Sequence, residues 1–130
     1  CYDGDVVRLG NLDPTRDLNF VGDTVEGFLR AAESEQAVGK TLNLGSGREI
    51  SIGDLAATIA RVLGKSVRIE CEAQRKRPKG SEVERLLADA RMMAELTGWA
   101  PIVSLEEGLA QTIEWIAANR AAFRSNTYQI

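Results

Sequence analysis

The chain has 130 residues, 44% of them hydrophobic and 27% charged, with a formal net charge of −3 at pH 7. This composition is typical of a single globular domain, or of one lobe of a larger fold, with a hydrophobic core. The acidic balance argues against nucleic acid or an anionic membrane as a partner, and no apolar run approaches the roughly 20 residues that span a bilayer. The chain contains no histidine, so neither a zinc enzyme nor a His-based hydrolase is expected.

The two cysteines and the first residue bear on where the chain works and on its extent. Cys1 and Cys71 have no spacing typical of a metal or redox site, so we interpret them as free thiols and expect a cytoplasmic protein. The chain begins without Met, and an apolar pair at 6–7 follows almost at once. This start predicts a segment of a longer polypeptide.

The first third of the chain predicts two extended segments and a helix. A β-branched run predicts a strand over 6–9, and a second extended segment is expected over 18–21 after a turn. Asp23 and Glu26 have the spacing of a capping box, which predicts a helix that begins there. One face of this helix carries Val25, Phe28, Leu29 and Ala32.

The middle of the chain continues the alternation. A short strand is expected over 40–44, broken by the turn at 45–47. Ser51 and Asp54 repeat the capping pattern before a second helix, which ends at Gly64.

The last half predicts one more strand and two helices. The strand is expected over 67–69, and Asp89 is expected to open a helix that stops at Gly98. Ser104 and Glu107 predict the cap of the last and longest helix, with an inner face made of Leu105, Leu109, Ile113 and Ile116. Strands alternating with helices indicate an α/β fold.

A basic loop between these elements is the first candidate site. Residues 74–80 read Gln-Arg-Lys-Arg-Pro-Lys-Gly and place four cations within five positions of an acidic chain. Arginine suits phosphate because its planar guanidinium donates parallel hydrogen bonds and stays charged. The loop is therefore a candidate anion site, and a solvated charged loop is the alternative.

Two further stretches are candidates for binding. Arg16 stands just before an extended segment, where it could point at a ligand while Asp17 orients it; an exposed or salt-bridged pair is the alternative. The turn Gly45-Ser46-Gly47 is similar to a phosphate-cradling loop, but it lacks the P-loop ending, and a plain strand-to-helix turn explains it better. No Tyr-x-x-x-Lys and no nucleophile with a base is present, so no catalytic residue is assigned.

Taken in order, four stretches resemble one family. Residues 16–24 resemble the R-D-[FLY]-x-[YF]-V-x-D segment of extended short-chain dehydrogenases/reductases that act on nucleotide sugars. Residues 41–47 are similar to its Y-N-[LIV]-G-[SG]-G strand and turn, and residues 77–83 to its R-P-x-(x)-D/E loop. The ending L-G-W-x-P … L-E-E-G-L … W is matched over 96–115. The resemblance is to the NAD-dependent epimerase/dehydratase family and covers roughly residues 6 to 117.

The resemblance implies the fold and a division of labour. It implies the C-terminal part of a Rossmann-type α/β enzyme: the last strand–helix–strand units with a small helical substrate-binding subdomain. Residues 1–130 would form one substrate-binding lobe. NAD and the catalytic Tyr and Lys would belong to an N-terminal part absent from this chain, which is therefore expected to be inactive by itself.

The resemblance also implies roles for five residues. Arg16 would contact the pyrophosphate or ribose of a nucleotide-diphosphate sugar, and Arg77 its pyrophosphate. Glu82 is the nearest carboxylate to the family's acceptor for the ribose hydroxyls. Val7 and Leu9 would line the base pocket.

Several alternatives remain open at this point. The stretch 81–89 resembles the sugar-nucleotide 4,6-dehydratases most, whereas NDP-sugar 4-epimerases and UDP-glucuronate decarboxylases share most of the architecture. A stand-alone nucleotide-binding or assembly module is a rival of another class. A lobe separated from its sheet would leave open edges and apolar faces, which predicts a homo-oligomer.

Overall fold

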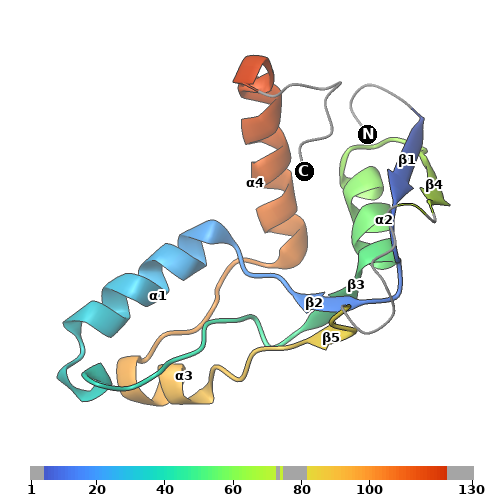
Figure 1. Cartoon of the computed structure of the whole chain (residues 1–130). Helices are drawn as coiled ribbons and strands as arrows, with labels where there is room; N and C mark the ends of the chain where they lie inside the picture. Colours follow the sequence, from blue (N-terminus) through green and yellow to red (C-terminus); the bar gives the residue numbers. More distant parts are fainter. Residues whose placement is uncertain (1–4, 73, 75–81, 123–130) are drawn as a thin grey trace.

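The computed structural model describes residues 5–72, 74 and 82–122, which form helices and short strands in alternation. Figure 1 shows helices α1 (Val21–Glu33) and α3 (Arg91–Thr97) on one side of a small sheet and α2 (Ile52–Val62) on the other. Helix α4 (Leu105–Ala118) rises above that sheet and contacts α2. The arrangement confirms the α/β class.

Two separate sheets account for the strands of the described residues. Strand β1 (Val6–Leu9) pairs in parallel with β4 (Arg68–Cys71), and α2 lies in the connection between them. Strand β2 (Thr15–Asp17) is the middle strand of the other sheet. It runs antiparallel to β3 (Glu49–Ser51) and parallel to β5 (Arg85–Leu86). Strand β1 has the predicted bounds, and β4 lies one residue later and is longer than the expected 67–69.

The caps of two helices agree with the prediction. Ser51 is the N-cap of α2, and its hydroxyl accepts a 3.0 Å hydrogen bond from the backbone N–H of Asp54. At α4, Ser104 and Glu107 form the full capping box, each side chain satisfying the other residue's backbone N–H. Such reciprocal bonds satisfy orphan N–H groups at a helix start.

The start of α1 differs from the prediction. The helix begins at Val21 after Phe20, which makes no side-chain cap, so the expected extended segment over 18–21 and the Asp23–Glu26 capping box are both wrong. Asp23 is buried, and its Oδ2 accepts a 3.1 Å hydrogen bond from the backbone N–H of Val103. A distant backbone group thus uses the carboxylate that was expected to cap α1.

A small core joins α1 to α3. Trp99 and Met93 are almost fully buried, and Trp99 Nε1 donates a 2.9 Å hydrogen bond to the carbonyl of Asp23. The absence of a side chain at Gly27 lets Leu44 pack closely against α1, because a Cβ at this position would lie 2.5 Å from Cδ2 of Leu44. The segment before the Gly-Ser-Gly turn is therefore held against α1.

The strand expected over 40–44 has no partner among the described residues, so it forms part of neither sheet. A strand requires a ladder of backbone hydrogen bonds to a neighbour, which a sequence pattern cannot supply. The described helices include none that is long and apolar enough to cross a bilayer.

Candidate functional site

Strand pairing brings two of the predicted site residues together. Parallel pairing of β2 with β5 places Arg16 opposite Leu86, and the backbone N–H of Thr15 donates a 2.8 Å hydrogen bond to the carbonyl of Glu84. The chain just before β5 therefore passes beside β2. As a result, the side chains of Arg16 and Glu82 meet although 66 positions separate them.

Arg16 and Glu82 form a partly buried ion pair, and both side chains have hydrogen-bonding groups without a partner among the described residues. Arg16 Nη2 lies 3.5 Å from Glu82 Oε1, and Nη1 donates a 2.7 Å hydrogen bond to the carbonyl of Thr15. The side chains of Arg16 and Glu82 are 24% and 21% exposed. Arginine carries five N–H donors. Its other N–H groups, and Oε2 of Glu82, have no partner among the described residues. The pair can thus donate to an anion and accept from a hydroxyl at the same place.

Asp17 has a different role from the one predicted. Its Oδ1 accepts hydrogen bonds from the backbone N–H and the hydroxyl of Ser46, at 2.8 and 2.6 Å. Its Oδ2 accepts from the N–H groups of Gly47 and Ala88, at 3.0 and 3.3 Å. The idea that Asp17 orients Arg16 is therefore wrong: this carboxylate holds the turn and the chain after β5 against β2.

The same contacts decide the nature of the Gly-Ser-Gly turn. Its backbone N–H groups could surround an anion, as such groups do in phosphate-binding loops. The anion present is the side chain of Asp17, which takes the N–H groups of both Ser46 and Gly47. The turn is therefore structural and is held by Asp17, but the expected strand-to-helix connection is wrong, because no strand directly precedes the turn among the described residues and β3 follows it.

The charged side chains of Arg85 and Glu49, on the two strands that flank β2, bind each other. Arg85 donates two hydrogen bonds to Glu49, of 2.7 and 2.8 Å, and the hydroxyl of Thr15 donates another of 2.8 Å. These hydrogen bonds hold the pKa of Glu49 below its ordinary value, and those from Arg85 have the largest effect. Arg85 is thus engaged across the sheet, whereas Arg16 keeps donors for a ligand.

The other predicted site residues are not joined to this pair. Arg77 lies outside the described residues. Val7 and Leu9 lie on β1, paired with Ile69 and Cys71 of β4 in the other sheet. No described contact links them to the Arg16–Glu82 pair, so their role as a base pocket stays a prediction.

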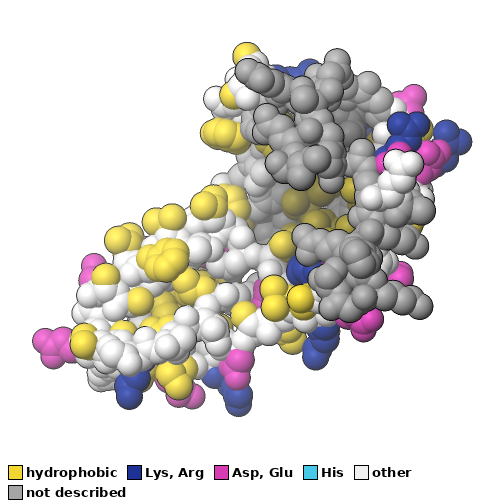
Figure 2. Space-filling view, viewed as in Figure 1, with side chains coloured by type: hydrophobic (Ala, Val, Ile, Leu, Met, Phe, Trp, Pro, Cys, Tyr) yellow, Lys and Arg dark blue, Asp and Glu magenta, His cyan; other side chains and the backbone are white. Residues whose placement is uncertain are grey.

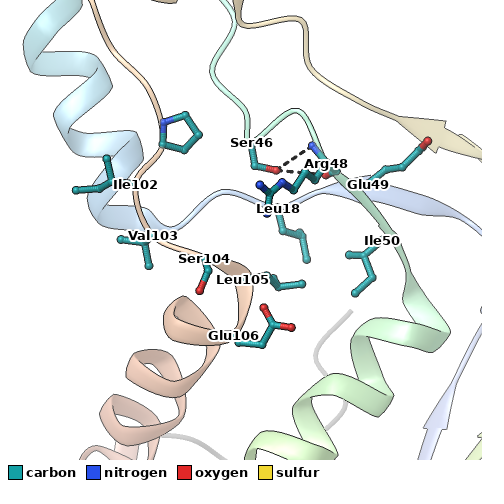
Figure 3. Close-up of a pocket in the computed structure, with 11 residues that line it drawn as sticks. Leu18, Ser46, Arg48, Glu49, Ile50, Ile102, Val103, Ser104, Leu105 and Glu106 are labelled. Carbon is teal, nitrogen blue, oxygen red and sulfur yellow. Dashed lines mark hydrogen bonds between the residues drawn. The ribbon is translucent and has the colours of Figure 1, made fainter.

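Sequence reasoning missed a cavity of about 430 Å³ beside the small sheet. Figure 3 shows its lining residues, which come from the turn before β3 and β3 itself, from residues 101–106 around the start of α4, and from Leu18 just after β2. They include apolar Leu18, Ile50 and Val103 and charged Arg48 and Glu106. Neither Arg16 nor Glu82 lines it. No sequence motif points to it, because its walls come from three distant segments. The part of the chain that the structure describes contains no group of side chains that could hold a metal ion.

Comparison with known proteins identifies the family. The family model described as GDP-mannose 4,6 dehydratase matches residues 2–112. The chain belongs to the NAD-dependent epimerase/dehydratase family. GDP-L-fucose synthase of Escherichia coli K12, for example, is 33% identical to this member over 128 residues. Other relatives of this epimerase/dehydratase chain include UDP-glucose 4-epimerases and a UDP-glucuronic acid decarboxylase.

Solved structures agree with this family assignment. An epimerase from Methanothermobacter thermautotrophicus matches 94% of the chain with a TM-score of 0.82 and 28% identity. UDP-glucuronic acid 4-epimerase from Bacillus cereus, solved as a mutant with a fluorinated UDP-sugar and NAD, matches 88% with a TM-score of 0.73 and 25% identity. The match to the E. coli synthase covers 92% of this epimerase/dehydratase chain. The chain spans only about one third of its relatives: 38% of that synthase and 36% and 35% of the two structures.

Proposed function

We propose that this chain is the nucleotide-sugar-binding lobe of an NAD-dependent sugar-nucleotide enzyme. The single observation that carries the proposal is the Arg16–Glu82 pair, which β2–β5 pairing assembles from two segments of the chain. The names of the relatives, which act on UDP- and GDP-sugars, support this substrate class.

The chemistry of the pair suits a nucleoside diphosphate. The free N–H groups of Arg16 can donate to pyrophosphate oxygens, and Glu82 can accept hydrogen bonds from ribose hydroxyls. Partial burial strengthens both interactions, because water screens them less. Arg77, in the basic loop that precedes Glu82, would add a second donor to the pyrophosphate. Binding energy from the nucleotide would then position the sugar for reaction.

The cofactor and the catalytic groups would come from outside this chain. The chain holds no Tyr-x-x-x-Lys, so NAD and the acid–base residues belong to the remainder of the enzyme in this proposal. The description of the matching family favours a 4,6-dehydratase. That reaction moves hydride from C4 of the sugar to NAD, eliminates water across C5–C6 and returns the hydride to C6. Among the alternatives, 4-epimerisation or decarboxylation would share the same nucleotide contacts.

Calorimetric titration of the 130-residue chain with UDP, GDP and dTDP tests the proposal. We expect at least one diphosphate to bind, and Arg16→Ala to weaken it about 10- to 150-fold, because a hydrogen bond to a charged group contributes roughly 1.5–3 kcal/mol. Arg30→Ala is the matched control, since Arg30 is an exposed arginine on α1 paired with Glu26.

Two results would contradict the proposal. One is that no diphosphate binds, and the other is that Arg16→Ala and Arg30→Ala bind alike. The reaction class needs a different measurement, on the enzyme that contains this lobe together with its NAD-binding part. A 4-keto-6-deoxy sugar as product would support the dehydratase, and a 4-epimer or a pentose would assign the alternatives. The chain alone is expected to show no turnover with NAD and nucleotide sugars.

A further inference from the structure

One ion pair of this chain joins two strands that are not neighbours. Figure 2 shows basic side chains next to acidic ones at several places on one face of the molecule. Most of the described ion pairs join residues of one element or of two adjacent strands, as Arg30 and Glu26 do on α1. Glu49 and Arg85, in contrast, stand on β3 and β5, and β2 runs between these two strands.

The Glu49–Arg85 bridge crosses one face of β2, and Arg16 starts from the other face. Successive side chains of a strand point to opposite faces, and residues that pair across strands share a face. Thr15 pairs with Arg85, and its hydroxyl donates to Glu49, so the bridge lies on the Thr15 face. Arg16 is the next residue along β2. No described contact joins the bridge to Arg16 or Glu82, so any effect on that pair must pass through the backbone.

Strand β5 has little packing to hold it in place. It consists of Arg85 and Leu86, and all residues from 83 to 87 are exposed. A ladder of this length provides few hydrogen bonds, and exposed side chains add little hydrophobic stabilisation. The position of β5 along β2 therefore needs support from side chains.

The register of β5 decides whether the Arg16–Glu82 pair forms. Glu82 lies three positions before Arg85, so the place of β5 limits where the Glu82 carboxylate can reach. A slip of one residue moves a strand by about 3.3 Å and turns its side chains to the other face. The contact between Arg16 Nη2 and Glu82 Oε1 is 3.5 Å long, so a slip of that size would break it. Arg16 itself is tied to β2 by its hydrogen bond to the carbonyl of Thr15.

The geometry of the bridge suits it to fixing this register. An exposed ion pair contributes little unless it is bidentate or belongs to a network. Arg85 binds both carboxylate oxygens of Glu49, at 2.7 and 2.8 Å, and Thr15 on the strand between them adds a third hydrogen bond of 2.8 Å. Two parallel bonds define the relative position of both side chains, which a single contact does not. The bridge thus connects all three strands of the sheet.

We propose that Glu49 and Arg85 are positioning residues of the nucleotide site: their bridge fixes the register of β5 and so places Glu82 beside Arg16. The inference rests on the proposed function, which gives the Arg16–Glu82 pair its ligand. It adds that two residues with no contact to that pair determine whether the pair is assembled.

Amide hydrogen exchange of the 130-residue chain, measured without any nucleotide, tests the placement of β5. The backbone N–H of Thr15 reports on it, because this group donates to the carbonyl of Glu84 just before β5. In Arg85→Gln the Thr15 N–H should exchange at least about 10-fold faster, because β5 is released. The N–H of Glu72, bonded to the carbonyl of Leu9 beside the other sheet, should exchange as in the wild type and shows that the chain is folded.

Three further variants complete this measurement. Arg91→Gln is the matched control, because Arg91 is an exposed arginine that also binds both oxygens of a carboxylate, that of Asp89, but joins no strands. It should leave the exchange of the Thr15 N–H unchanged. The double variant Glu49→Arg, Arg85→Glu rebuilds the bridge in reverse and should restore the wild-type rate to within about threefold. Arg85→Lys keeps the charge without the two parallel bonds and should give a smaller acceleration; it replaces Arg85→Gln if that variant does not fold.

A double-mutant cycle of diphosphate binding tests the link to the site. The ligand is whichever of UDP, GDP and dTDP binds most tightly to the wild type. Arg85→Gln should weaken its binding about 10-fold, because Glu82 no longer lies beside Arg16. In the Glu82→Ala background the same substitution should weaken binding by less than about twofold, since the bridge acts through Glu82. A general loss of folding would weaken binding equally in both backgrounds.

Four results would overturn the inference. The first is an unchanged exchange rate of the Thr15 N–H in a folded Arg85 variant, and the second is an equal acceleration in Arg91→Gln. The third is a reversed bridge that does not restore the rate, and the fourth is an equal loss of affinity in both backgrounds of the cycle. If no diphosphate binds, the proposed function fails, whereas the exchange measurements still decide whether the bridge places β5.

Discussion

Replacing the carboxylate of Asp17 by an amide should destabilise the chain more than any other isosteric change of an acidic residue near the site. Asp17 holds three segments together: β2, the turn at 45–47 and the chain after β5. In Asp17→Asn the remaining oxygen can still accept from the N–H and hydroxyl of Ser46. The new amide group then faces the N–H groups of Gly47 and Ala88, so donors oppose donors.

The magnitude follows from the two lost bonds. A hydrogen bond to a charged group contributes roughly 1.5–3 kcal/mol, and the lost bonds are 3.0 and 3.3 Å long. Because the longer bond is weak and Asp17 is only half-buried, we expect a loss of about 2–3 kcal/mol. With a urea m-value of about 1.5 kcal/mol/M, the midpoint should fall by roughly 1.3–2 M.

Urea unfolding followed by circular dichroism and tryptophan fluorescence measures this loss. Asp13→Asn is the control, because it makes the same chemical change at an exposed residue four positions earlier in the chain. Equal midpoints for Asp17→Asn and Asp13→Asn would refute the reasoning. If the variant is unfolded without urea, a stabilising osmolyte series moves the transition into range.

Two other predictions concern packing and pH. Gly45→Ala would place a Cβ 2.4 Å from Cβ of Ala88 and should lower the free energy of unfolding by about 1–3 kcal/mol. The Cβ of Gly53→Ala meets no atom closer than 3.5 Å, so this variant should be neutral or stabilising by up to about 1 kcal/mol. Similar urea midpoints for the two variants would contradict this. Hydrogen bonds from the side chain and then the backbone of Arg91 lower the pKa of Asp89 from 3.8 to about 2, so their stabilisation is present above pH 3.8 and is lost as the pH falls through 2. The difference in melting temperature between wild type and Arg91→Gln should therefore shrink between pH 4 and pH 2, and a constant difference would show that the pair does not titrate with folding.

Local features were predictable because their atoms lie close in the sequence. The capping box of α4 needs only residues 104 and 107, and the cap of α2 only residues 51 and 54. Glycines with positive φ end helices at Gly64 and Gly98 for an equally local reason, since other residues rarely adopt that conformation. Each of these interactions joins residues within four positions of one another, so its partners can be read from the sequence.

Predictions that depended on a distant partner failed. Asp23 has the correct spacing to Glu26 for a capping box, but the N–H of Val103, 80 positions away, takes its carboxylate. Residues 40–44 have the composition of a strand, but no neighbouring strand is present among the described residues. In both cases the pattern was correct and the partner decided the outcome.

The sequence by itself determined the family, the caps of α2 and α4 and the periodicity of α1, and through the family it selected Arg16 and Glu82. Only the tertiary structure decided that Arg16 and Glu82 touch, that Asp17 holds the Gly-Ser-Gly turn and that the apolar face of α1 is exposed. The physical reason is how far apart in the sequence the interacting atoms lie. Caps and helix periodicity depend on atoms within four positions, whereas ion pairs, strand ladders and burial depend on which distant segments meet.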